Sequence, residues 1–212
     1  MSVSFDRSRA FWLHPEPLIL ASKSKGRRAA LEQTGAPFLV HPVEIDERAV
    51  EAEVVAAGGD ADAVAARLAR DKATLVSLTR PGALVLGADQ VASCERRRFG
   101  KPPTVAAARE QLRFLAGRTH RLHSAIAIAR DGALIFETVA HADLTMRAFS
   151  DDFLARYLES VAEEATTSAG AYQIEGLGVH LFERILGDHW TIIGLPLLPL
   201  LDALRREGAL RS

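Results

Sequence analysis

Two short segments of the chain carry side chains suited to chemistry on an anion. In the first, residues 18–28, an apolar run is followed by Ser22, Ser24, Arg27 and Arg28. We expect a buried strand that opens into a polar crevice, with a helix that begins among the serines. Hydroxyl groups and arginines at the start of a helix are well placed to bind phosphate.

The second segment, residues 86–91, is an apolar run that contains one carboxylate. Asp89 falls where we predict the end of a buried strand, and Gly100, Lys101 and Pro102 follow closely. An acid at that point suggests a functional role, although a turn residue that opens a hairpin is a serious alternative. Cations for an anionic substrate and a carboxylate for a metal or water indicate chemistry on a polyphosphate.

Each candidate also has an ordinary structural explanation. Arg27 and Arg28 could solvate the outer face of a helix, but the serine-rich turn before them favours phosphate binding. Lys72 could extend its ammonium group to solvent from an apolar-rich helix, and Lys101 could be a plain loop lysine. The run 96–98 of three arginines is typical of a solvated turn. No one of these residues decides the function alone.

Several familiar catalytic motifs are missing from the sequence. The Gly-Lys at 100–101 lacks the preceding glycine of a phosphate-binding loop, and a proline follows it. No Gly-x-Gly-x-x-Gly, His-Glu-x-x-His or Gly-x-Ser-x-Gly occurs. The histidines are scattered singly, and we expect most to be surface or internally satisfied residues rather than metal ligands. Of the seven histidines in the chain, this expectation concerns His41, His120, His123, His141, His180 and His189.

Composition predicts one domain over residues 1–212, with enough chain to bury a core and room for two lobes. Of its 212 residues, 48% are hydrophobic and 25% are charged, and the net charge of -1 predicts no nucleic-acid or membrane partner. The single cysteine, Cys94, excludes an internal disulfide. Residues 1–17 lack the apolar core of a signal peptide, and no apolar run approaches ~20 residues. We therefore expect a cytoplasmic protein.

Alternating strands and helices, interrupted by a hairpin, predict an α/β fold. We expect a mixed twisted sheet with flanking helices, in two lobes around a central cleft. The hairpin turns at Asp131-Gly132, and Thr104 and Ser150 are expected to cap helices. Strands are predicted at 18–21, 38–40, 84–87, 121–130 and 134–146, and helices at 27–33, 61–78, 104–115, 151–161 and from 196.

Taken together, the ordered motifs resemble the Maf family of nucleoside triphosphate pyrophosphatases, from Leu18 to Gly208. Any one of these fragments is weak evidence, whereas the ordered set is specific. The fragments are Leu20–Arg28, Ile45–Glu47, Lys72–Ala73, Gly87–Asp89, Gly100–Pro102, Ala116–His120, Ala169–Tyr172 and Gly194–Pro196. The resemblance implies a fold like that of inosine triphosphate pyrophosphatases.

The resemblance also implies a reaction and roles for residues. The enzymes of this family hydrolyse the α–β phosphoanhydride to a nucleoside monophosphate and pyrophosphate. Asp89 would accept a proton from water, and Glu47 and Asp89 would hold Mg²⁺ or Mn²⁺. The cations that would neutralise the triphosphate are Arg27, Lys72 and Lys101, and the substrate-binding set would be Ser22, Gly26, Arg28, Gln90 and Glu175. A homodimer is also possible for such an enzyme.

One branch of the family, acting on 7-methyl-GTP, resembles this chain most at Gln90, Glu175 and residues 181–184. A carboxylate can accept hydrogen bonds from N1–H and the amine of guanine, and methylation at N7 adds positive charge to the base. Gly26 and Ser168 depart from the common patterns, which carry a large side chain and a lysine there. A pyrophosphatase for dTTP, UTP or other modified nucleotides, and a non-catalytic nucleotide-binding regulator of cell division, remain the alternatives.

Overall fold

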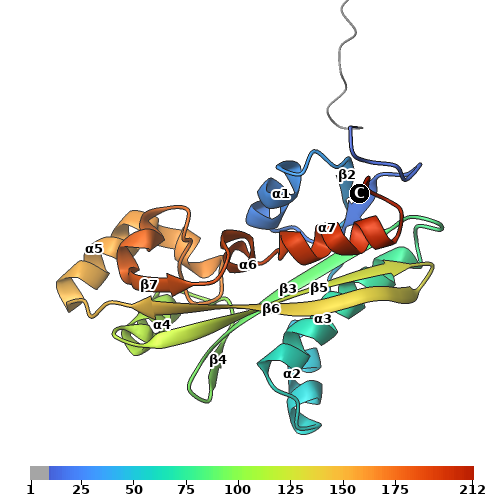
Figure 1. Cartoon of the computed structure of the whole chain (residues 1–212). Coiled ribbons are helices and arrows are strands. Elements are labelled where there is room, and N and C mark those ends of the chain that lie inside the picture. The colour runs from blue at the N-terminus through green and yellow to red at the C-terminus, as the bar shows by residue number, and fades with distance from the viewer. Residues whose placement is uncertain (1–9) are drawn as a thin grey trace, which may run out of the picture. The chain divides into compact units, whose positions relative to one another are not determined.

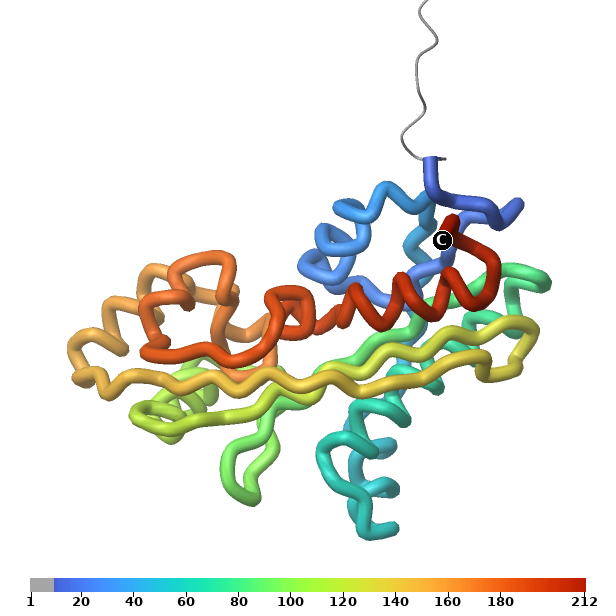
Figure 2. The backbone as a smooth tube through the Cα atoms, in the orientation of Figure 1, coloured from blue at the N-terminus to red at the C-terminus, as the bar shows by residue number. Residues whose placement is uncertain are grey.

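The computed structural model describes residues 10–212, so part of the expectation for the N-terminal segment lies outside the described residues. The chain divides into two compact units. The first contains the described residues up to Asp89, together with 124–140 and 193–212, and the second contains 90–123 and 141–192. Strands β3, β5 and β6 each contain residues of both units. Figure 2 traces the backbone, with the colour running along the residue numbers. The single domain over 1–212 and its central cleft stay predictions.

The strands form a mixed seven-stranded sheet, which confirms the α/β class. The order is β2-β1-β3-β5-β6-β7, with β4 paired to β3. β1 is parallel to β2 and β3, whereas the β3–β4 and β6–β7 pairs are antiparallel. The strands are β1 (Leu18–Leu20), β2 (Phe38–Val40), β3 (Val85–Cys94), β4 (Arg97–Phe99), β5 (Thr119–Arg130), β6 (Ala133–Met146) and β7 (Phe182–Leu186).

Three helices of the first unit, α1, α2 and α3, begin at side-chain caps that are visible in the sequence. Ser24, Asp46 and Asp60 each accept a hydrogen bond from a backbone N–H of the first turn. The predicted helix over 61–78 is confirmed, because its small and branched apolar residues repeat at helical spacing. The helix at 47–56 was not predicted, since Val50 is its only buried residue. The helices are α1 (Lys25–Glu32), α2 (Glu47–Ala56), α3 (Ala61–Ser77) and α7 (Leu197–Arg206).

The second unit is built around an aromatic and aliphatic core. Thr104 and Ser150 cap its two longer helices as predicted. Apolar residues of these helices pack with Leu144 and Met146 of β6 and with Tyr172. The elements are α4 (Val105–Leu115), α5 (Asp151–Val161), α6 (His189–Ile193) and two short 3₁₀ helices, η2 (Ala162–Thr166) and η3 (Leu177–Leu181).

The long hairpin of β5 and β6 confirms the Asp-Gly turn signal (Figure 1). Asp131 and Gly132 adopt positive φ values of 52° and 80°, which such a turn requires. Side-chain pairs equidistant from Gly132 meet across the strands. Arg121 forms a bidentate ion pair with Asp143 at 2.7 and 2.8 Å. This ion pair joins the two strands of the hairpin.

The structure corrects two expectations about the segment around Asp89. β3 continues from Val85 to Cys94, so Asp89 lies inside a strand rather than at its end. Apolar burial resumes after Asp89, at Val91 and Ala92, and the strand continues with it. The three arginines do not form a turn: Arg97 and Arg98 pair with β3, and only Arg96 lies in the turn, beside Glu95 at φ 57°.

No helix within residues 10–212 has the length and apolar character needed to cross a bilayer.

Candidate active site

A lysine held between two carboxylates is the centre of the candidate site in the first unit. The Nζ atom of Lys72 lies 2.6 Å from Oδ1 of Asp89 and 2.7 Å from Oε1 of Glu47. The side chains of Lys72 and Asp89 are only 9% and 10% exposed, whereas that of Glu47 is 52% exposed. The site therefore has a buried ion pair and one partner that faces solvent.

The glycine of the Gly-Ala-Asp motif explains why Asp89 can reach Lys72. A Cβ atom at Gly87 would lie 2.0 Å from the carbonyl oxygen of Ala69 and 2.7 Å from the backbone nitrogen of Ala73. Both atoms belong to α3, the helix that carries Lys72. Only glycine permits β3 to approach this turn of α3 so closely.

The two acidic residues of the motif at 45–47 make different contacts. Asp46 caps α2 by accepting a hydrogen bond of 3.0 Å from the backbone N–H of Ala49. Glu47 is the first residue of that helix, where a carboxylate is favoured by the helix dipole. The cap thus fixes the start of α2 and places the carboxylate of Glu47 against Lys72.

Arg27 joins three separate segments of the first unit. Its Nη1 atom donates to the carbonyl oxygen of Ala88 at 2.7 Å and to Oγ of Ser22 at 3.2 Å. Its Nε atom donates to the carbonyl oxygen of Gly194 at 2.9 Å. The guanidinium group is therefore bound to the carbonyl group of Ala88, the residue directly before Asp89. Gly194, the first residue of the Gly-Leu-Pro motif, supplies another of its acceptors.

Burial and neighbouring charges shift the pKa values of Asp89 and Arg27 in opposite directions. Burial raises the pKa of Asp89 above its ordinary value, and the positive charges of Lys72 and Arg27 oppose that rise. Burial likewise lowers the pKa of Arg27, while Asp89 and Glu47 oppose the change. A carboxylate whose pKa is raised by burial is a stronger base than one in water, which suits it to accepting a proton.

Not every predicted residue of the first unit joins this network. Ser22 does so through Arg27, and Ser24 caps α1. The Nε atom of Arg28 instead donates to Glu32 at 2.9 Å on an exposed face of α1. Gly26 lies in the first turn of α1. The binding roles of Arg28 and Gly26 stay predictions.

Three predicted residues belong to the second unit: Gln90, Lys101 and Glu175. The side-chain nitrogen of Gln90 donates to the carbonyl oxygens of Thr191 and Ile192 at 3.1 and 3.0 Å, so both its N–H groups bind α6. Lys101 is exposed in the segment between β4 and α4, and Glu175 is exposed in the loop before η3. Their roles stay predictions.

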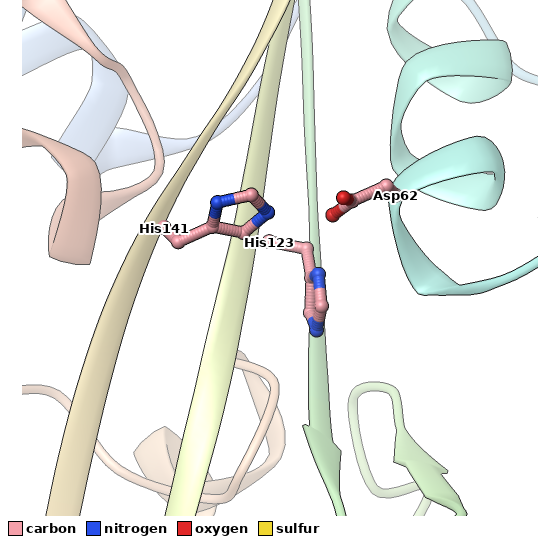
Figure 3. Close-up of side chains that lie close together, drawn as sticks. All are labelled: Asp62, His123 and His141. Carbon is pink, nitrogen blue, oxygen red and sulfur yellow. The ribbon is translucent and has the colours of Figure 1, made fainter.

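Two histidines that look unrelated in the sequence meet on the β5–β6 hairpin (Figure 3). The rings of His123 and His141 lie 5.3 Å apart and nearly perpendicular, and Nε2 of His123 is 2.7 Å from Oγ of Ser93. The contact depends on how the two strands align, which single scattered histidines do not reveal in the sequence. Figure 3 also labels Asp62, on α3 of the first unit.

The donor atoms around Lys72 fit a hard divalent cation. Glu47 and Asp89 both direct a carboxylate oxygen to the same nitrogen atom, and carboxylate oxygens are the ligands that Mg²⁺ and Mn²⁺ prefer. These are the two residues that the sequence analysis assigned to a metal. Of the two carboxylates, that of Glu47 is half exposed and that of Asp89 is buried.

The fold and the site define a class: an α/β protein whose buried acid and fixed cations suit hydrolytic chemistry on an anionic substrate. Comparison with known proteins gives the family. The model of the Maf-like protein family matches residues 17–207, and the chain therefore belongs to the Maf family. The resemblance found from the sequence motifs is confirmed.

Named relatives support the same assignment. A nucleoside triphosphate pyrophosphatase of Rhodopseudomonas palustris is 54% identical over 94% of this chain and 98% of its own length. A 7-methyl-GTP pyrophosphatase of Rhizobium etli is 54% identical over 91% of this chain and 97% of its own. A second 7-methyl-GTP pyrophosphatase, from Rhizobium johnstonii, is 52% identical over the same shares of the two chains. Relatives with both names are thus equally similar to this chain.

Proposed function

We propose that this protein is a nucleoside triphosphate pyrophosphatase that releases a nucleoside monophosphate and pyrophosphate. The observation that carries the proposal is the buried Asp89, held at 2.6 Å from Lys72 and flanked by Arg27. The names of relatives that match nearly the whole chain support the same reaction.

In the proposed reaction, the oxygen of a water molecule attacks the α-phosphorus of the substrate. Asp89 accepts the proton that this water loses, and the bond from the α-phosphorus to the bridging oxygen breaks. Pyrophosphate leaves with the electrons of that bond. The raised pKa of Asp89 makes its carboxylate a stronger proton acceptor, and the positive charges of Lys72 and Arg27 oppose that rise.

The cations of the site have a second proposed task, which is to stabilise negative charge on the triphosphate. Arg27 is held by three acceptors, so it needs little reorganisation when charge develops. Lys101 is assigned to the same task by its Gly-Lys-Pro motif. A divalent cation held by Glu47 and Asp89 would supply further charge neutralisation at the phosphate oxygens.

For the nucleotide, we propose 7-methyl-GTP. Glu175 offers an exposed carboxylate that can accept from the N–H groups of guanine, and its charge favours a base made cationic by methylation. Gln90, whose N–H groups are bound to α6, is fixed in orientation and is proposed to contact the same base. Two of the similar relatives are named for this substrate.

A nucleotide panel tests the proposal. Purified protein is supplied with Mg²⁺ or Mn²⁺ and with 7-methyl-GTP, GTP, UTP or dTTP, and pyrophosphate release is measured. We expect the highest kcat/KM on 7-methyl-GTP. Preference for dTTP or UTP would overturn the substrate but keep the reaction. Tight nucleotide binding with no metal-dependent pyrophosphate release would overturn the reaction and favour a regulatory protein.

A further inference from the structure

A buried histidine of the second unit binds the segment that carries Glu175. His120, at the start of β5, is only 1% exposed. Its Nε2 atom lies 2.7 Å from the hydroxyl oxygen of Tyr172, a residue that is 5% exposed. Tyr172 precedes Glu175 by three positions. A hydrogen bond inside the core therefore ends at a residue that is three positions before the proposed base-reading carboxylate.

The same histidine contacts both ends of this loop. The ring of His120 lies 5.5 Å from that of Tyr172, where the loop begins, and 6.0 Å from that of Phe182, where β7 begins. The rings of Tyr172 and Phe182 also pack edge to face at 4.8 Å. The three rings thus close the loop 172–182 at its base, while Glu175 stays exposed in the part between.

Inside the loop, backbone contacts on both sides of Glu175 hold the chain in a compact fold. The backbone N–H of Gly176 donates to the carbonyl oxygen of Gln173 at 3.3 Å. A Cβ atom at Gly178 would lie 2.3 Å from the same oxygen, so only glycine fits there. On the other side, the hydroxyl of Ser168 donates to the carbonyl oxygen of Tyr172. These contacts restrain the backbone on both sides of Glu175, between Gln173 and Gly178.

From this geometry we infer that His120 is a positioning residue for base recognition, acting through Tyr172 to hold Glu175 in place. The inference rests on the proposed function, because it takes Glu175 as the residue that reads the base. It assigns to the Thr-His of the motif at 116–120 a task in specificity. His120 itself need not touch the substrate, since its ring is enclosed by core residues.

A hydrophobic ring at position 120 would fill the same space, so packing alone does not require histidine. What phenylalanine cannot supply is the hydrogen bond to the hydroxyl group of Tyr172, which is itself buried. A buried hydroxyl left without its partner is destabilised and drives local rearrangement. Phenylalanine at 120 should therefore loosen the loop while leaving most of the core intact.

The test compares His120→Phe and Tyr172→Phe with His120→Gln, whose amide can still reach the tyrosine hydroxyl. Hydrogen–deuterium exchange of amides 173–181 measures how tightly the loop is held. Kinetics on 7-methyl-GTP and UTP measure kcat and KM separately. Leu112→Ala is the control, because it destabilises the same core from α4.

We expect the amides of residues 173–181 to exchange faster in both phenylalanine variants. The ratio of kcat/KM for 7-methyl-GTP to that for UTP should fall about tenfold in each. The loss should come through KM, with kcat nearly unchanged, and His120→Gln should restore part of it. Combining His120→Phe with Glu175→Gln should add little to either change, since both act on one carboxylate.

Two results would overturn the inference. One is unchanged exchange over 173–181 in both phenylalanine variants. The other is an equal fall in kcat/KM on both nucleotides in these variants and in Leu112→Ala. These results are distinct from a failure of the proposed function, in which the unaltered protein releases no pyrophosphate from any nucleotide. The exchange measurement still reports on the role of His120 in that case.

Discussion

The two units hold their candidate residues in opposite ways. In the first, Asp89, Lys72, Glu47 and Arg27 form a network of ion pairs and charged hydrogen bonds, and its central pair is about nine-tenths buried. In the second, Glu175 is exposed, and the loop that carries it is anchored by aromatic rings and one neutral hydrogen bond.

The difference follows from what each set is proposed to do. Groups that stabilise charge in a transition state act best when they are fixed beforehand in a site that excludes water. A carboxylate that must read a base has to remain available, so it is held through its backbone and not through its own oxygens. Changes in the charged network around Lys72 should therefore alter rate and stability, and changes at Glu175 should alter preference.

The largest expected effect is that of Asp89→Asn on turnover. Removing a positioned proton acceptor typically costs 10²–10⁴-fold, and we expect kcat for pyrophosphate release to fall by about that factor. Asp202→Asn, at an exposed ion pair with Arg206, is the matched control and should leave kcat unchanged. Near-normal turnover in folded Asp89→Asn would show that another group activates the water.

Lys72→Met should unfold the protein more readily, because it leaves the carboxylate of Asp89 buried without its nearest cation. Loss of one partner from a buried pair costs about 3–5 kcal/mol, measurable by urea denaturation. Lys23→Met, which breaks an exposed pair with Glu44, should cost under about 1 kcal/mol. The double variant Lys72→Met with Asp89→Asn should regain stability; if it does not, the pair is not the cause.

Acid should destabilise the second unit through His120. Burial lowers the pKa of His120 to about 4, against a partial opposing effect of Asp143. The unfolded chain binds the proton near pH 6.5, so this stability is present above that pH and is lost as the pH falls toward 4. Between pH 7 and 5 the loss should be about 2 kcal/mol. Urea denaturation of His120→Phe should lack this part of the pH dependence, and an identical slope would contradict the assignment.

The smallest expected effect is that of Glu175→Gln, and it falls on preference. We expect the ratio of kcat/KM for 7-methyl-GTP to that for UTP to drop about tenfold, because an amide no longer complements a cationic base. The rate on UTP should hardly change, and the free energy of unfolding should stay the same. A uniform loss on all nucleotides would show that Glu175 does not read the base.

Local signals in the sequence predicted much of the fold. The Asp-Gly turn, the caps Thr104 and Ser150 and the apolar spacing of α3 each act within a few residues, so they are readable without the rest of the chain. The course of β3 was not predicted, because a charged residue inside a strand is interpretable only once its partner is known. Lys72 supplies that partner from another element. The helix α2 was missed for a related reason, since so little of it is buried.

The sequence by itself determined the family to which the chain belongs, and it named the candidate residues for chemistry: an acid, a lysine and an arginine in ordered motifs. Tertiary structure alone decided how they act together. Arg27 binds the backbone of β3, whereas Arg28 pairs with Glu32 on the exposed face of α1. Gly87 lets β3 approach α3, so that Asp89 reaches Lys72, and His120 reaches Tyr172. Each of these contacts depends on which distant segment of the backbone packs against the residue. Such contacts are set by packing between elements, and packing has no signature in the order of residues.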